Sequence, residues 1–405
     1  MTDNRQIGVL IIVENLPVPF DRRVWQEATT LRQEGYVVSI ICPVGKGYKK
    51  RYEEIEGIHI YRHPLPIEGD GLGGYIGEYA VALSWEFYLT WKVFFKHGFD
   101  AIHACNPPDL IFLIGAFFKC LMGKKFIFDH HDINPELYLA KFGKKDLLYK
   151  LITLLEKLSF YVSDISIATN MSYRDIAIDR GRRSPEKVFV VRSGPDLQKM
   201  RSVPQNPALK SGKKYMVGYV GVMGKQEGLD LLLKSVHRIL YVNHRTDIKF
   251  VLIGSGTELE NLKKISSDLE LDRYVEFTGR ISDALLLEYL STCDICVNPD
   301  IANEMNDKST MNKIMEYMAL SKPIVQFDLT EGRFTAQDAS LYAKRNDEID
   351  FAEKILFLVD HEEARNHMGE FGLKRVREHL HWGVEKSKLI SAYQTLFPLK
   401  NISMT

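Results

Sequence analysis

Short runs of β-branched and aromatic residues alternate with longer amphipathic segments along almost the whole chain of 405 residues. This alternation predicts parallel sheets with helices on both faces, because each parallel crossover needs a connection of about a helix in length. The predicted strands of the first half are Ile7–Val13, Val37–Cys42, Ile58–Tyr61, Ala101–Ala104, Phe126–Asp129, Ile165–Ala168 and Lys187–Val191. Those of the second half are Tyr215–Gly221, Ile248–Ile253, Tyr274–Phe277, Ile295–Asn298 and Pro323–Phe327.

The alternation stops between Ser193 and Lys214, a stretch that holds three prolines, two glycines and scattered charge. We therefore predict a linker over residues 194–214 between two α/β domains, each a doubly wound parallel sheet of the Rossmann-like kind. The first domain covers residues 1–193 and the second covers 215–381. Ligands of such open sheets bind at the carboxyl ends of the strands, so we expect a functional cleft where these edges face each other.

The bulk composition narrows the class of protein. Lys plus Arg and Asp plus Glu number 53 each, so no global field draws the chain to nucleic acid. Five cysteines, an odd number, argue against a disulfide framework and favour a reducing cytoplasm. The first apolar run ends at Glu14, which is typical of a strand rather than a signal peptide. We expect no membrane-spanning segment, since no run approaches the roughly 18 apolar residues required.

The segment Tyr75–Phe95 is unusually aromatic and is predicted to be helical. One interpretation is a core helix of a large domain. The other is a helix with one face near a membrane or an apolar acceptor. The basic clusters Lys46–Arg51 and Lys141–Lys145 are solvated faces or, together with this helix, support weak contact with an anionic membrane, each charge adding about 1 kcal/mol.

The string MNKIMEYMALSKPIVQFD, which begins at Met311, predicts a helix, a tight connection and a buried strand. A helix that opens behind polar residues 307–310 offers free backbone N–H groups to an anion. A carboxylate about two turns inside it can bind ribose hydroxyls, so the string indicates a nucleotide site. An exposed ion pair one turn apart is the alternative interpretation of the two charges. The candidates are Ser309, Thr310, Met311, Lys313 and Glu316.

A glycine-rich turn from Gly221 to Gly228 follows the first predicted strand of the second domain. Glycines there let backbone N–H groups approach a phosphate, although a purely structural turn explains them equally. We take Gly221 and Gly224 as candidate phosphate contacts and Lys225 as the cation of the turn.

The string FDHHDINPELY follows a strand of the first domain and places four titratable residues, 129–132, at its carboxyl end. The pattern allows a metal site, residues that cap the next helix, or a catalytic position. A metal is the least favoured of the three, because no second ligand motif accompanies the string. The family resemblance given below implies the roles in this string: His131 is the first catalytic candidate, Asp132 is the second, and Glu136 either binds an acceptor or orders the loop.

The loop after the first strand contains two prolines and leads to a helix that begins near Asp21. Arg22 or Arg23 at its start could grip a phosphate bidentately, and one of the two is expected to point outward. Asn106, before Pro107, is a further candidate at the cleft edge. Cys293 and Cys296 form a CxxC within a strand pattern and are interpreted as structural.

These motifs, in this order, resemble the retaining GT-B glycosyltransferases of family 4, also called the group 1 type, and the string HDINPE resembles a subgroup with an HDxxPE signature. The segment RSGPDL and the closing HWGVEKSKLISAYQTLF resemble the corresponding parts of that family. The resemblance implies a GT-B fold with an acceptor-side domain at 1–193, a donor domain at 215–381 and a last helix, 382–405, that returns to the first domain.

The resemblance also implies a chemistry. Its substrate is a nucleoside-diphosphate sugar, with a UDP-sugar favoured, and transfer retains the anomeric configuration without a metal or other cofactor. His131 then lies beside the transferred sugar, Gly254 borders the donor, and Arg280 and Ile281 cradle the base. Three departures stand out: family members often carry Arg, Lys and Glu where this chain has Val222, Glu227 and Lys308.

Family analogy favours a lipid-linked or glycan acceptor in surface polysaccharide assembly, and a cytoplasmic protein on the inner face of the cell membrane. Two other functions stay open. One is a non-catalytic partner subunit of a true transferase, which the three departures motivate. The other is a sugar-nucleotide 2-epimerase, which would turn over a sugar nucleotide without an acceptor.

Overall fold

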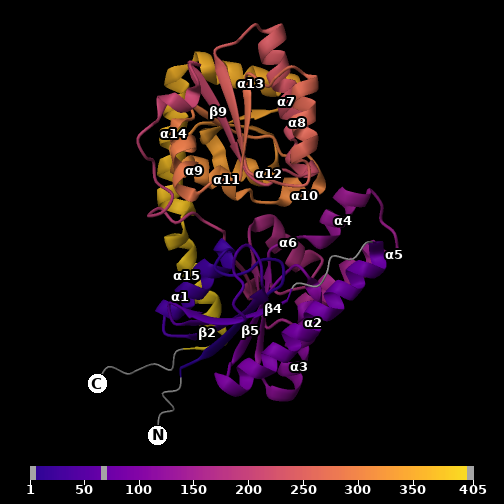
Figure 1. The fold of residues 1–405 in the computed structure, drawn as a ribbon. Helices are drawn as coiled ribbons and strands as arrows, with labels where there is room; N and C mark the ends of the chain where they lie inside the picture. Colours follow the sequence, from indigo (N-terminus) through magenta and orange to yellow (C-terminus); the bar gives the residue numbers. More distant parts are fainter. Residues whose placement is uncertain (1–5, 65–70, 399–405) are drawn as a thin grey trace, which may run out of the picture. The chain divides into compact units, whose positions relative to one another are not determined.

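The computed structural model describes residues 6–64 and 71–398. The chain divides into two compact units, Met1–Arg192 with Glu385–Thr405, and Ser193–Val384 (Figure 1). Each unit is a parallel sheet between helical layers, as the strand–helix alternation predicts. Helices of the described residues are too short or too polar to cross a bilayer.

The first unit is built on a sheet of eight strands in the order β3-β4-β2-β1-β5-β6-β7-β8. All neighbouring strands are parallel except β3, which pairs antiparallel with β4. The bounds are β1 Gly8–Val13, β2 Val37–Pro43, β3 Tyr52–Ile55, β4 Ile58–His63, β5 Ala101–Cys105, β6 Lys125–His130, β7 Ile165–Ala168 and β8 Val188–Val190.

Helices cover both faces of this sheet. Right-handed crossovers place α1, which runs from β1 to β2, on one face, and the helices that connect β4 through to β8 on the other. The helix α15 lies beside α1, where Lys386 and Glu34 form an ion pair of 3.2 Å. The bounds are α1 Arg22–Gln33, α2 Gly71–Lys96, α3 Phe112–Met122, α4 Asn134–Phe142, α5 Leu147–Val162, α6 Met171–Asp179 and α15 Trp382–Leu396.

The second unit has a six-stranded, fully parallel sheet in the order β11-β10-β9-β12-β13-β14. Its strands are β9 Tyr215–Val220, β10 Ile248–Ile253, β11 Val275–Gly279, β12 Ile295–Asn298, β13 Ile324–Phe327 and β14 Ser340–Ala343. Its helices are α7 Leu229–His237, α8 Leu259–Asp268, α9 Asp283–Thr292, α10 Glu304–Lys308, α11 Asn312–Ala319, α12 Thr330–Ala336, α13 Glu348–Asp360 and α14 Glu362–Arg375.

The expected linker, residues 194–214, is packed onto the second unit rather than loose. The backbone N–H of Val203 donates to Ser291 Oγ at 3.0 Å, and that of Asn206 donates to Thr292 Oγ1 at 3.0 Å. These bonds satisfy backbone groups that strand pairing would otherwise serve, which is why a segment without periodicity is still ordered.

The sequence analysis did not predict two of the strands, β3 and β14. Both lie at a sheet edge, have only four residues and carry few fully buried side chains. An edge strand has a single neighbour and one solvated side, so its hydrophobic pattern is weak.

Candidate active site

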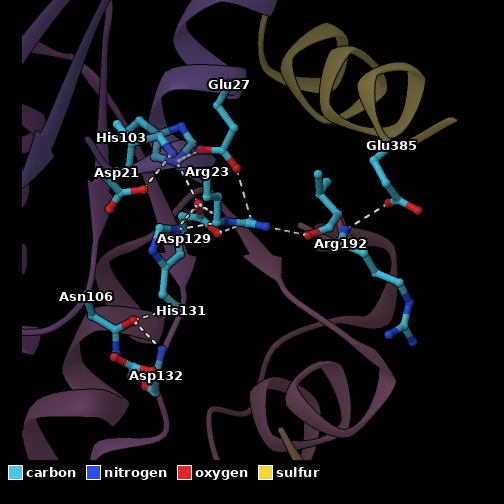
Figure 2. A network of polar contacts seen from close by, with 12 residues as sticks. Asp21, Arg23, Glu27, His103, Asn106, Asp129, His131, Asp132, Arg192 and Glu385 are labelled. Carbon is cyan, nitrogen blue, oxygen red and sulfur yellow. Dashed lines mark hydrogen bonds and ion pairs between the residues drawn. The ribbon is translucent and has the colours of Figure 1, made fainter. Parts of the chain in front are cut away.

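A buried polar network in the first unit gathers at the carboxyl ends of β5 and β6 (Figure 2). Its cation is Arg23, in the first turn of α1, a helix capped by Asp21, whose side chain accepts from Val24 N at 3.0 Å. The guanidinium donates to Asp129 Oδ1 at 2.9 Å and to the carbonyl oxygen of Val191 at 2.8 Å. It also pairs with Glu27, one turn further along α1, at 3.0 Å.

Asp129 is the acceptor at the centre of this network. Burial alone raises its pKa, but Arg23, His131 and the hydrogen bond from His103 outweigh burial and hold the pKa well below its usual range. Burial raises the pKa of the neighbouring Glu27 carboxyl well above its usual range. The stable arrangement is therefore one ionised carboxylate and one protonated carboxyl around a single guanidinium.

A chain of hydrogen bonds connects Asp129 to the C-terminal helix α15. His103 Nε2 lies 3.2 Å from Asp129 Oδ2, and His103 Nδ1 lies 2.8 Å from the hydroxyl of Tyr393. Burial lowers the pKa of His103, so the ring is neutral and carries one proton. With that proton on Nε2, His103 donates to Asp129 and accepts from Tyr393.

His131 follows β6 directly, and its ring Nε2 lies 2.5 Å from Asp129 Oδ2. Arg23 Nε lies 2.9 Å from the same nitrogen, so the network holds the ring through Nε2 and not through Nδ1. The backbone N–H groups of His131 and Asp132 donate to Asn106 Oδ1 at 2.7 and 3.1 Å. Asp129 thus fixes the ring of His131, and Asn106 fixes its backbone. Burial raises the pKa of the neighbouring Asp132 carboxyl.

Two expectations about acceptor contacts need correction, and for Glu136 one of the two alternatives holds. Arg23 is buried among protein partners and cannot grip a phosphate, whereas Arg22 points outward as one of the pair was expected to do. Asn106 is buried and orders the loop backbone instead of lining a surface. Glu136 is bound bidentately by Arg180 at 2.8 and 3.0 Å, so it orders the loop and does not hold an acceptor.

Arg23 also bears on the metal interpretation of the string FDHHDINPELY. Potential ligand atoms of Glu27, Cys105, Asp129 and His131 all lie within 4.8 Å of one another. The Arg23 guanidinium already contacts three of these four residues. Burial raises the pKa of Cys105 well above its usual range, so its thiol stays protonated and is a poor ligand. The cluster is therefore an arginine site rather than one suited to a metal ion.

In the second unit, the turns that follow β9, β10 and β11 meet at the carboxyl edge of the sheet. Gly221 N donates to the Ile253 carbonyl at 3.0 Å, and Gly254 N donates to the Gly279 carbonyl at 3.0 Å. Gly254 has a φ of +139°, and a Cβ there would lie 1.9 Å from the Gly221 carbonyl oxygen. Only glycine fits this junction, which brings two of the predicted donor positions into contact.

Lys313 projects to the same junction from the first turn of α11. Its ammonium lies 3.2 Å from Asp300, 3.4 Å from the Tyr219 hydroxyl and 3.4 Å from where a Cβ on Gly221 would stand. Burial alone lowers the pKa of Lys313, but Asp300 and Tyr219 raise it overall, so the side chain is a fixed cation. This charge lies beside the glycine turn in which Val222 and Glu227 replace the cations typical of the family.

The helix α11 begins later than predicted. Residue 309 belongs to the end of α10, where Ser309 Oγ donates to the Met305 carbonyl at 2.8 Å, and Thr310 Oγ1 lies 3.5 Å from Glu331. Met311 is the N-cap residue and makes no side-chain cap, and of the first-turn N–H groups that of Ile314 donates to the Met311 carbonyl at 3.0 Å. Glu316 is consequently one turn inside the helix, not two.

The face of α11 that carries Lys313 and Glu316 is set by packing on the opposite side. Tyr317 Oη accepts from Val220 N at 2.9 Å and donates to the Val297 carbonyl at 3.3 Å, which pins the helix to β9 and β12. Ile314 and Met315 are fully buried. Lys313 and Glu316 are left half-buried on the remaining face.

The glycine turn is more closed than predicted. Met223 N donates to the Ser255 carbonyl at 3.1 Å, and Gly224 N donates to Glu227 Oε2 at 3.0 Å. These N–H groups, with that of Gly221, are occupied within the protein and are not directed at a phosphate. Lys225 is exposed on the turn, Arg280 is exposed after β11, and the partly buried Ile281 packs beside the hydrophobic core.

Sequence reasoning missed five members of these two clusters. Glu27 had a usable signal, since it lies four residues after Arg23 on one helix face. His103 interrupts an otherwise apolar strand, which is also a signal. Tyr219, Asp300 and Tyr393 are positioned by contacts distant in sequence and carry no local signal.

The junction residues give a testable ranking of two cations. We expect Lys313→Met to weaken nucleoside-diphosphate binding about 10- to 100-fold, because it removes a desolvated charge–charge hydrogen bond. Lys225→Met should weaken it less, since an exposed charge is screened by water and salt. Titration calorimetry with UDP measures both, and a larger loss for Lys225→Met would assign the diphosphate contact to the turn instead.

Known glycosyltransferase family models match both halves of the chain. Residues 214–361 match the family model described as glycosyl transferases group 1, and residues 21–199 match the model described as glycosyltransferase family 4. An uncharacterized glycosyltransferase of Methanocaldococcus jannaschii is 28% identical over 38% of this chain and 41% of its own length. The capsular polysaccharide biosynthesis glycosyltransferase CapM of Staphylococcus aureus is 24% identical over 62% of this chain and 67% of its own length.

Solved structures share the fold at low identity. Sucrose-phosphate synthase of Thermosynechococcus elongatus superimposes with a TM-score of 0.81 at 17% identity, covering 97% of this chain and 99% of that one. HepE of Anabaena in complex with UDP and glucose gives a TM-score of 0.74 at 14% identity, covering 96% and 100%.

Proposed function

Since the chain is a glycosyltransferase of the GT-B, family 4 type, we propose that it transfers a sugar from a nucleoside-diphosphate sugar to an acceptor hydroxyl with retention of the anomeric configuration. The observation that carries this proposal is the junction in the second unit. There a glycine-only contact, the fixed cation Lys313 and the uncapped start of α11 lie together. This combination suits a diphosphate, and Glu316 one turn further along suits the ribose hydroxyls.

Lys313 offers a physical answer to the departures at Val222 and Glu227. A cation that is held by Asp300 and Tyr219 needs no reorganisation when negative charge develops on the departing diphosphate. Lys225 and the exposed Arg280 are further contacts that we propose for the diphosphate and the base. A UDP-sugar is favoured as donor, and HepE, which binds UDP, shares this fold.

We propose retention by positioning of the acceptor on the leaving-group side, without a covalent intermediate. Double displacement needs a carboxylate nucleophile about 5 Å from a second carboxyl group. Glu27 and Asp129 are neighbours, but both are fully buried and bound to Arg23, so neither can attack a sugar. The proposed reaction relies on hydrogen bonds and charge alone, and it requires neither a metal nor another cofactor.

His131 is the residue that we propose acts on the transferred sugar from the first unit. Its ring is fixed through Nε2 by Asp129 and Arg23, which leaves Nδ1 as the ring nitrogen to meet a hydroxyl. Asp132 is the second candidate. We also propose, from the surrounding HDINPE string, that the chain belongs to the subgroup with an HDxxPE signature.

The acceptor that we propose is a lipid-linked or glycan hydroxyl in surface polysaccharide assembly. CapM, a capsular polysaccharide biosynthesis enzyme by name, supports the proposal through its similarity to this chain. The protein would then act in the cytoplasm as a peripheral protein on the inner face of the cell membrane.

The donor site is tested by thermal shift against nucleoside diphosphates and their sugars, with Glu316→Ala beside the wild type. We expect a selective shift with one base, and a loss of donor affinity of about 10-fold or more in Glu316→Ala, since the hydrogen bonds that the ribose hydroxyls donate to the carboxylate are lost. The variant should melt within about 1 °C of the wild type without ligand, because Glu316 is only half-buried.

Other outcomes have definite meanings. A collapse of melting in Glu316→Ala would make this residue structural. The absence of any nucleotide shift in the wild type would instead favour a non-catalytic partner subunit. Turnover of a sugar nucleotide without acceptor would indicate an epimerase.

A further inference from the structure

Three helices form one layer on the first unit. Phe87 of α2 packs against Phe117 of α3 with ring centroids 5.1 Å apart, and Lys119 of α3 donates to the Val162 carbonyl of α5 at 2.7 Å. Right-handed crossovers place α2, α3 and α5 on the same face of the sheet, so their outer sides face solvent together (Figure 1).

The outer sides of α2 and α5 carry the same pattern. Exposed apolar residues recur at intervals of three, four or seven positions, which places them in one line along each helix. On α2 the line is Val81, Trp85, Tyr88 and Phe95; on α5 it is Leu147, Leu151, Leu154 and Tyr161. A soluble monomer rarely exposes two such lines on one face, and a large apolar patch marks an interaction surface.

Among the described exposed side chains of α2 and α5, charge has a single sign. Lys92 and Lys96 flank the line on α2, and Lys150 and Lys157 flank the line on α5, all four exposed. The acidic side chains described on these helices, Glu86 and Glu156, are both fully buried. The net charge of the whole chain is zero, so the positive face is a local feature and not a consequence of composition.

We propose that the outer faces of α2 and α5, with their flanking lysines, dock on the surface of an anionic lipid bilayer. Aromatic and aliphatic side chains would enter the headgroup region while the lysine stems extend along it toward anionic headgroups. A second copy of this chain fits the face poorly, because a symmetric pair would bring lysines opposite lysines. An open depression lined by Tyr88, Trp91 and Phe95 lies on this face and can hold part of an acyl chain.

The place of this face in the fold relates it to the proposed function, and the docking inference rests on that function. The line on α5 starts at Leu147, and α5 packs on α4, which begins at Asn134, three residues after His131. Docking through α5 would therefore keep the carboxyl edge of the sheet, where His131 lies, near a membrane-attached acceptor.

The experiment is sedimentation of the full-length protein with vesicles, without any nucleotide. Wild-type protein should bind vesicles of 30% phosphatidylglycerol in phosphatidylcholine about 10-fold or more better than phosphatidylcholine alone, and 0.5 M salt should reverse most of the gain. Phe95→Ser with Leu147→Ser, and separately Lys92→Glu with Lys150→Glu and Lys157→Glu, should each lower binding at least about 10-fold.

Matched controls lie on exposed positions of the second unit. Val242→Ser with Ile349→Ser, and Lys234→Glu with Lys264→Glu and Lys374→Glu, should change vesicle binding less than about twofold. Melting curves and UDP affinity of every variant separate a lost surface from a lost fold or a lost donor site.

The proposal is overturned by absent binding of the wild type, by equal binding to neutral vesicles, or by equal losses in the controls. A dimer in ultracentrifugation that Phe95→Ser with Leu147→Ser abolishes would assign the face to a second copy instead. UDP binding that persists in any of these cases leaves the donor site standing.

Discussion

Replacing Arg23 by methionine should lower the free energy of unfolding by about 3–5 kcal/mol. The guanidinium is the counter-charge of the ionised Asp129, and it also binds the protonated Glu27 and donates to the Val191 carbonyl, so one substitution removes a hydrogen-bond partner from several buried polar groups. Chemical denaturation of both proteins measures the difference. Arg22→Met is the matched control, since Arg22 is exposed on the neighbouring position of the same helix, and it should change stability by no more than about 0.5 kcal/mol.

The pH dependence of the Arg23→Met deficit has a definite sign. In the wild type the pKa of Asp129 is depressed, so its stabilisation is present above its unfolded pKa of about 3.9 and is lost as the pH falls through the folded value. Without Arg23, burial raises the pKa of Asp129, and stability is lost as the pH rises above about 4. The deficit should therefore grow with pH from the depressed folded pKa of Asp129 in the wild type up to its raised folded pKa in the variant, and it should be largest at neutral pH. A deficit that does not vary with pH would mean that packing, and not charge, is what Arg23 supplies.

The architecture followed from the sequence because hydrophobic period and helix length are local properties. Buried parallel strands such as Ile165–Ala168 were predicted to the residue, since they are fully buried, mostly apolar and bounded by polar segments. The edge strands β3 and β14 were not, because solvent replaces one neighbour and the pattern fades.

The candidate sites were predictable only in part, for a different reason. Motifs name residues at strand ends and helix starts, and Gly221, Gly254 and Lys313 do meet in one junction. A motif does not say which groups are already satisfied within the protein. The sequence indicates that Arg23 and Glu136 bind ligands. In the structure each forms an ion pair with a residue distant in sequence, Arg23 with Asp129 and Glu136 with Arg180.

His131→Ala should lower the rate of sugar transfer by about 100-fold or more while the dissociation constant of the donor changes less than about threefold. The separation is expected because His131 belongs to the first unit, whereas the proposed diphosphate and ribose contacts, Lys313 and Glu316, belong to the second. Asp129 keeps its bonds to Arg23 and His103 in this variant, so the fold should persist. Initial rates at saturating donor, together with calorimetry, measure the two effects.

The control for His131 is His379→Ala, an exposed histidine of the second unit, which should leave both rate and affinity unchanged. Equal losses of rate and donor affinity in His131→Ala would remove its proposed role, because a group that acts only in transfer affects the transition state and not donor binding. A normal rate would move the assignment to Asp132, whose raised pKa also suits proton transfer. Within the first unit, Asp129 holds the His131 ring and Asn106 the backbone of both candidates, so His131→Ala tests whether the fixed imidazole or the half-buried Asp132 carboxyl meets the sugar.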